Sequence, residues 1–228
     1  MNSSTLSADI ISFTSLAMED KRKIELSIRQ LITELTEKYK EYGFFGRIVH
    51  GDYIECAMHS PVYIFRIALL LKTLIKSFEL SEDDVENKRN KYFKEYGIRI
   101  AIAVAPLMVL DAKNGIIDGE AIYLSGRAIK DMSTSNKRKV VIKNSMFFCS
   151  QDIYEQEKYD TMISLIDTIF SRCSPKQCEV IYYKLLDFSE KEISGKLKRN
   201  QSTISQHSTA AGWNAIEKTV NYFENNIL

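Results

Sequence analysis

Two aspartates lie where carboxylates could hold a divalent metal ion. Asp9 falls within an alternating run from Ser3 to Phe13 that predicts a short strand, and Asp52 belongs to Gly51-Asp52, a dipeptide suited to a tight hairpin turn. Mg²⁺ and Mn²⁺ take oxygen ligands, and Mg²⁺ usually rests on one or two carboxylates plus substrate phosphates. Two carboxylates meeting at neighbouring strand ends would therefore suit phosphoryl or nucleotidyl transfer. Aspartate also commonly caps turns, and for these two residues that alternative stays open.

A second set of residues, near the C-terminus, has the spacing of a nucleic-acid reader. Ser174-Pro175-Lys176-Gln177 and Ser189-Glu190-Lys191-Glu192 each pair a capping serine with a Gln or Glu three residues on, which predicts helices over 174–186 and 189–198. Asn200 or Gln201 would cap a third helix. The first residues of such a helix can reach base edges in the major groove of DNA. The candidate base readers are Gln201, Ser202, Thr203, Ser205, Gln206 and His207.

Three cations accompany these readers. Lys196, Lys198 and Arg199 fall in or beside the turn between the second and third helices, where they would meet phosphates and position the module without reading sequence. Ile193, Leu197 and Ile204 would form the small core beneath. The alternative is a helical module used for dimerisation or protein contact, which the nearly balanced charge of this region keeps open.

The elements that must position the two aspartates follow from periodicity. After the first strand, we expect a helix over 18–42, a hairpin over 44–58, a helix over 62–78 capped by Ser60-Pro61, a strand over 97–106, a helix over 119–132 and a strand over 139–142. The order predicts an α+β fold whose helices pack mainly on one face of a sheet. We divide the chain into a domain over 1–148, a linking helix over 149–172 and a helical domain over 173–228.

Composition narrows the class of protein. The 228 residues carry a formal net charge of +1, and 45% are hydrophobic, which is typical of a globular protein and argues against a strong charge field for nucleic acid or membrane. The N-terminal residues lack the pattern of a signal peptide and no run is long enough to cross a membrane, so we expect a cytoplasmic protein without a membrane partner. Four cysteines without CxxC spacing are expected to be reduced and mostly buried.

Three short segments resemble class III nucleotidyl cyclases. ADIISFTSL is similar to the family's DIxxFT start, HGDYIEC to its GD hairpin, and DGEAIYLSGR to its GDAVNxAAR helix. The resemblance implies a ferredoxin-like, nucleotidyl-cyclase-type sheet, metal binding by Asp9 and Asp52, an Arg127 that steadies the transferring phosphate, and a head-to-tail homodimer. An active metal-dependent nucleotidyl cyclase, or a related nucleotide enzyme, is the corresponding function.

Two positions differ from the cyclase pattern. Tyr123 stands where the family has a catalytic asparagine, and Ile48 stands where it has a purine-reading lysine. The segment DGEAIYLSGRAI is more similar to the corresponding segment of SatD-like proteins. The resemblance to these proteins extends over about residues 5–131. These differences favour a degenerate domain that dimerises and binds a nucleotide without turnover.

The C-terminal segment EISGKLKRNQSTISQH resembles the EIAxxLxxSxSTVxxH pattern of LuxR-type and sigma-factor region-four helix-turn-helix domains. This resemblance implies an all-α helix-turn-helix domain with DNA as its partner. Taken together, the sequence predicts a DNA-binding transcriptional regulator with a cyclase-like dimerisation or sensor domain. The remaining alternative is a protein-interaction module without nucleic acid.

Overall fold

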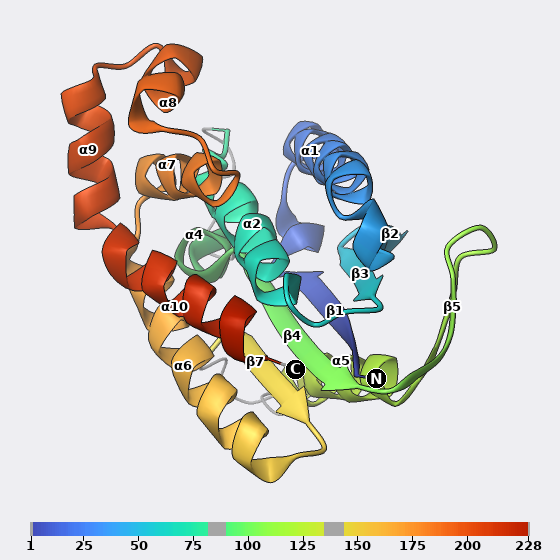
Figure 1. Ribbon diagram of the computed structural model, residues 1–228. Coiled ribbons are helices and arrows are strands. Elements are labelled where there is room, and N and C mark those ends of the chain that lie inside the picture. The colour runs from blue at the N-terminus through green and yellow to red at the C-terminus, as the bar shows by residue number, and fades with distance from the viewer. Residues whose placement is uncertain (1, 82–89, 135–143, 228) are drawn as a thin grey trace.

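A five-stranded mixed sheet forms the centre of the molecule (Figure 1). The computed structural model describes residues 2–81, 90–134 and 144–227. The strands run in the order β2-β3-β1-β4-β7, where β4 and β7 pair in parallel and the other neighbours are antiparallel. Their bounds are β1 (Ser3–Ile10), β2 (Phe45–His50), β3 (Tyr53–Met58), β4 (Ile98–Ala105) and β7 (Met146–Ser150). The predicted α+β class is confirmed, and the Gly51-Asp52 turn joins β2 to β3.

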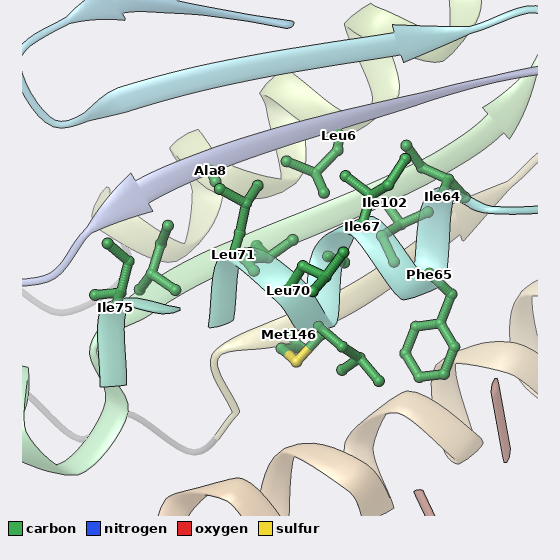
Figure 2. Packing of buried hydrophobic residues seen from close by; sticks show 14 of the residues in the cluster. Leu6, Ala8, Ile64, Phe65, Ile67, Leu70, Leu71, Ile75, Ile102 and Met146 are labelled. Carbon is green, nitrogen blue, oxygen red and sulfur yellow. The ribbon is translucent and has the colours of Figure 1, made fainter. Parts of the chain in front are cut away.

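One face of the sheet packs on α1 (Met18–Lys38) and α2 (Ile64–Ser77). Alternate residues of β1, such as Leu6 and Ala8, point at α2 (Figure 2). The intervening hydroxyl groups point the other way, toward α5 (Glu120–Thr134). The sheet is therefore covered on both faces, whereas the sequence led us to expect helices mainly on one.

The first two helices begin and end at different residues from those predicted. α2 begins at Ile64, because Ser60 and Pro61 form a turn in which the Ser60 hydroxyl accepts a hydrogen bond from the Val62 amide. α1 ends at Lys38, and a 3-10 turn, Lys40–Tyr42, carries the chain to Gly43, whose φ is +65°. Residues 79–94 are dense in charge and lack periodicity, which predicts either a solvated connection or a short helix; the described part of this region contains a short helix, α4 (Lys91–Tyr96).

A two-stranded arm, which the sequence periodicity did not predict, extends from the end of β4. β5 (Leu107–Asp111) pairs with β6 (Ile116–Gly119), and Figure 1 shows the pair reaching away from the body. Gly119 closes the base of the arm with φ +136°, and a Cβ there would lie 2.7 Å from the Met108 nitrogen. The strand predicted over 139–142 falls outside the described residues.

Five helices complete the chain: α6 (Ile153–Arg172), α7 (Pro175–Leu185), α8 (Glu190–Leu197), α9 (Gln201–Ala210) and α10 (Trp213–Asn226). Both predicted capping boxes, at Ser174 and Ser189, are confirmed. Helices α6, α7 and α10 share the core of α2; for example, the rings of Phe65 and Phe223 lie 5.2 Å apart. Within the described part of the chain, no helix is long and apolar enough to span a membrane.

A buried ion pair joins the sheet to the helices. The ammonium group of Lys72, on α2, lies 3.0 Å from a carboxylate oxygen of Asp167, on α6, and both residues are buried. Asp167 also accepts hydrogen bonds from the backbone amides of Ser145 and Met146, and Lys72 donates to the Ser145 hydroxyl. The network therefore fixes α6 against α2 and the start of β7.

Candidate functional site

The structure brings Asp9 and Asp52 close enough to interact. The carbonyl oxygen of Asp52 accepts a hydrogen bond of 3.0 Å from the amide of Ile10, next to Asp9. The pKa of Asp9 is raised above its usual value, first by burial and further by the negative charge of Asp52, while the positive charge of Arg99 opposes the rise. Both aspartates therefore lie at the β1 and β2-β3 edge that the strand pattern predicted.

The carboxylate of Asp9 is paired with a cation of the chain itself. Arg99, directly opposite Asp9 on β4, donates a hydrogen bond from Nη2 to Asp9 Oδ2. A divalent ion would need the Asp9 carboxylate as an unpaired ligand, but Arg99 already occupies it. Among the described residues, no group of three or more His, Cys, Asp or Glu side chains could hold a metal ion. Because Asp9 is already paired with Arg99, the two aspartates do not offer Mg²⁺ or Mn²⁺ a pair of open carboxylates, and we derive no chemistry through a metal.

The face of the sheet that carries Asp9 is polar. Tyr53 lies opposite Asp9 on β3, and its pKa is raised by burial. Two residues further along β3, on the same face, Glu55 forms an ion pair with Arg47 of β2. Arg47 also donates a hydrogen bond to the carbonyl of Gly115 in the arm. Charged and phenolic groups therefore line this part of the face, where an apolar core would otherwise be expected.

Arg127 is not brought to the aspartates within one chain. Ser125 faces the sheet, where its hydroxyl lies 2.9 Å from that of Ser7 on β1. Tyr123 and Arg127, four residues apart and therefore on one helical row, are exposed on the opposite side of α5. Tyr123 donates a hydrogen bond to Asp118 at the helix start. Arg127 therefore lies on the side of α5 that faces away from the sheet.

Helix α9 presents a polar row to solvent. Its inner side buries Ile204 and Ser208, and Ile204 packs with Val180 of α7 and Ile193 of α8 in a cluster separate from the main core. Leu197 packs against this cluster, so the predicted small core is confirmed and gains Val180. Of the candidate base readers, Gln201, Ser202 and Gln206 are exposed, and Thr203, Ser205 and His207 are half-buried.

The turn before α9 holds its three cations in three different ways. Lys198 adopts a left-handed conformation, φ 50° and ψ 44°, and is exposed. Arg199 forms an ion pair of 2.9 Å with Glu179 of α7. The ammonium group of Lys196 lies 4.4 Å from the ring centre of Phe188. Lys198 is therefore the cation in this turn best placed for a phosphate.

Sequence reasoning missed three residues of these sites. Arg99 lies within the alternating run that predicted β4, and only the register with β1 shows that its partner is Asp9. Glu179 of α7 was missed for the same reason, because its ion pair with Arg199 depends on how α7 packs against the turn before α9. Thr209, exposed and one turn beyond Ser205 on α9, extends the polar row past His207 and could have been found from helical periodicity.

Comparisons with known proteins give a faint likeness. No protein-family model matches the sequence, and a search of curated proteins found no match. Among solved structures, the chain is similar to the guanylyl cyclase Cya2, with 14% sequence identity and a TM-score of 0.34. The match covers 56% of this chain and 68% of that chain.

Proposed function

We propose that the protein is a DNA-binding transcriptional regulator whose α8 and α9 act as a helix-turn-helix. The observation that carries the proposal is the exposed polar row of α9, which is held on α7 and α8 by the cluster of Val180, Ile193 and Ile204. A recognition helix needs this combination, because its inner side must be anchored while its outer side reads base edges. Lys198 supplies a phosphate contact beside the row.

The polar row has the chemistry of base readout. Glutamine side chains can bond adenine through two hydrogen bonds, and serine and threonine hydroxyls bond several base edges. On α9 these are Gln201, Ser202, Gln206 and Thr209, all exposed. Their neutrality means that most of the salt-dependent affinity must come from the flanking lysines.

The arm of β5 and β6 is proposed as the contact between two copies. Met108, Val109 and Ile116 expose 73%, 41% and 48% of their surface, although all three are apolar. The arm reaches away from the body on the side opposite α8 and α9 (Figure 1), so a second copy could bind it and leave both α9 helices free. A dimer would present two recognition helices, which must match half-sites about 34 Å apart or a multiple of that.

The polar face around Asp9, Arg99 and Tyr53 is proposed as a nucleotide-sensing site in this dimer. The Arg99 side chain is 20% exposed, so part of its guanidinium is accessible to an anionic ligand. Binding without turnover is favoured over cyclase activity, because Asp9 is already engaged by Arg99.

Fluorescence anisotropy with a labelled random duplex at low salt tests the DNA-binding proposal. Gln206→Glu should abolish binding, because a carboxylate on the outer row would face phosphates and base acceptors. Gln151→Glu makes the same change at an exposed position just before α6, far from α9, and should bind like the wild type. Failure of the wild-type protein to bind the duplex at low salt would contradict the proposal.

The arm is tested separately by sedimentation velocity. Met108→Glu should convert a dimer to a monomer, whereas Met18→Glu, at an equally exposed methionine on α1, should leave the dimer intact. Identical sedimentation of Met108→Glu and wild-type protein would rule out the arm as the dimer contact.

A further inference from the structure

Cys173 and Cys178 lie on either side of the start of α7. Ser174 is the N-cap of that helix, so Cys173 immediately precedes the cap and Cys178 is the fourth residue of the helix. Side chains at these two positions commonly pack together and fix how the chain enters a helix. Here the capping box of Ser174 and Gln177 holds that geometry.

The two thiols interact directly, and they differ in reactivity. Both thiols lie in the main hydrophobic core, and the Cys173 thiol donates a hydrogen bond of 3.4 Å to the carbonyl of Ile169 on α6. Interaction with Cys178 lowers the pKa of Cys173 and raises that of Cys178; at Cys173 burial opposes this lowering, and the ammonium group of Lys76 adds to it. Cys173 is 9% exposed and Cys178 is fully buried. Cys173 is therefore the thiol that a small oxidant meets first, with Cys178 behind it.

We propose that Cys173 and Cys178 are a peroxide-sensitive thiol pair that closes to a disulfide. The Cys173 thiolate attacks one oxygen of hydrogen peroxide, the O–O bond breaks, and the leaving hydroxide takes a proton to become water. Cys178 then displaces the sulfenic hydroxyl of Cys173 as a second water. Two thiols and one peroxide thus give one disulfide and two waters, with two electrons passing from sulfur to oxygen.

The bond would act on the turn before α9. A disulfide holds its sulfurs about 2.05 Å apart, closer than two thiols in contact, so the first turn of α7 must shift toward the end of α6. Glu179, the next residue after Cys178, holds Arg199. Oxidation would therefore displace the anchor of α9 and weaken DNA binding, a regulatory consequence that rests on the proposed function.

Peptide mapping tests the thiol pair without reference to DNA. Trypsin cleaves after Arg172, Lys176 and Lys184, which places Cys173 in the peptide 173–176 and Cys178 in the peptide 177–184. After treatment of the full chain with hydrogen peroxide, mass spectrometry without reductant should find these two peptides joined. Cys149→Ser, which removes the half-buried thiol of β7, should still give the joined peptide, and Cys178→Ser should not. Separate peptides in oxidised wild-type protein would overturn the thiol pair.

Anisotropy of the same samples tests the regulatory consequence. Oxidised wild-type protein should bind duplex DNA up to about fivefold more weakly than reduced protein, because a partly exposed ion pair such as Glu179–Arg199 contributes at most about 1 kcal/mol. The affinity of Cys178→Ser should not respond to peroxide. Joined peptides with unchanged affinity would overturn the regulatory consequence alone, and joined peptides in a protein that never binds DNA would overturn the proposed function alone.

Discussion

Arg199, in the turn before α9, forms an ion pair with Glu179 of α7, with 2.9 Å between Nη1 and Oε2. The contact joins residues 20 positions apart and ties the turn to the helix beneath it. The Ser194 hydroxyl donates a hydrogen bond to the carbonyl of Arg199 and closes the same turn. Arg199 therefore positions α9, while its neighbour Lys198 stays exposed.

This difference separates the effects of two neighbouring substitutions. Lys198→Ala should weaken DNA binding and reduce the slope of log affinity against log salt by about 0.9, because one phosphate contact is lost. Arg199→Ala should instead lower the free energy of unfolding by up to about 1 kcal/mol, as expected for a partly exposed pair. Salt titrations by anisotropy and urea unfolding measure the two effects. Lys40→Ala, at an exposed lysine of the 3-10 turn after α1, is the matched control; a slope that fell equally for Lys40→Ala would contradict the assignment of Lys198.

Asp9 should make stability depend on pH in a direction unusual for a paired carboxylate. Its pKa in the folded state is raised above the ordinary 3.8, so the folded state holds the proton more tightly than the unfolded state. The contribution of Asp9 is then fully present below pH 3.8 and is lost as the pH rises through the folded-state pKa. Urea unfolding of wild-type protein and Asp9→Asn between pH 3 and about 7 isolates this group, because the other titrations are common to both proteins. The advantage of the wild type over the variant should shrink as the pH rises; growth of that advantage would show that Arg99 outweighs burial.

Removing one partner of the buried ion pair between Lys72 and Asp167 should strongly lower the free energy of unfolding. Asp167→Ala leaves the Lys72 ammonium uncompensated in the core and frees the amides of Ser145 and Met146, so we expect a loss of about 3–5 kcal/mol in the free energy of unfolding. Glu157→Ala, at an exposed position on the same helix, should change stability by less than about 0.5 kcal/mol. Urea unfolding checks both, and equal stability of the two variants would mean that the network contributes little.

Two glycines should respond to alanine in opposite directions. Gly119→Ala places a side chain at φ +136° and against the backbone of Leu107. The substitution should therefore disrupt the base of the arm and destabilise the protein. At Gly195, inside α8, no atom would lie within 4 Å of an added Cβ, so Gly195→Ala should stabilise the protein by about 0.5–1 kcal/mol. The unfolding temperatures of both variants test this prediction. A lower unfolding temperature for Gly195→Ala would contradict the expectation that an added methyl group on α8 points into solvent.

Much of the fold followed from local patterns. The alternation of β1 and β4, the turn at Gly51-Asp52 and the two capping boxes each depend on residues close together in the chain, and each was predicted at or within a few residues of its observed place. The arm of β5 and β6 was missed because its short strands, around an exposed turn, carry little periodic signal. The helix predicted at Ser60-Pro61 began late because a local serine turn competed with capping.

By itself, the sequence determined the order of most elements outside the arm, the polar row of α9 and the position of both aspartates at neighbouring strand ends. These features depend on periodicity and helix capping, which involve residues close together in the chain and can therefore be predicted from the sequence. Only the tertiary structure decided that Arg99 pairs with Asp9, that Glu179 holds Arg199, and that Arg127 is turned away from the aspartates. These relationships depend on strand register and helix packing between distant segments, where a shift of one residue turns a side chain to the other face of the sheet.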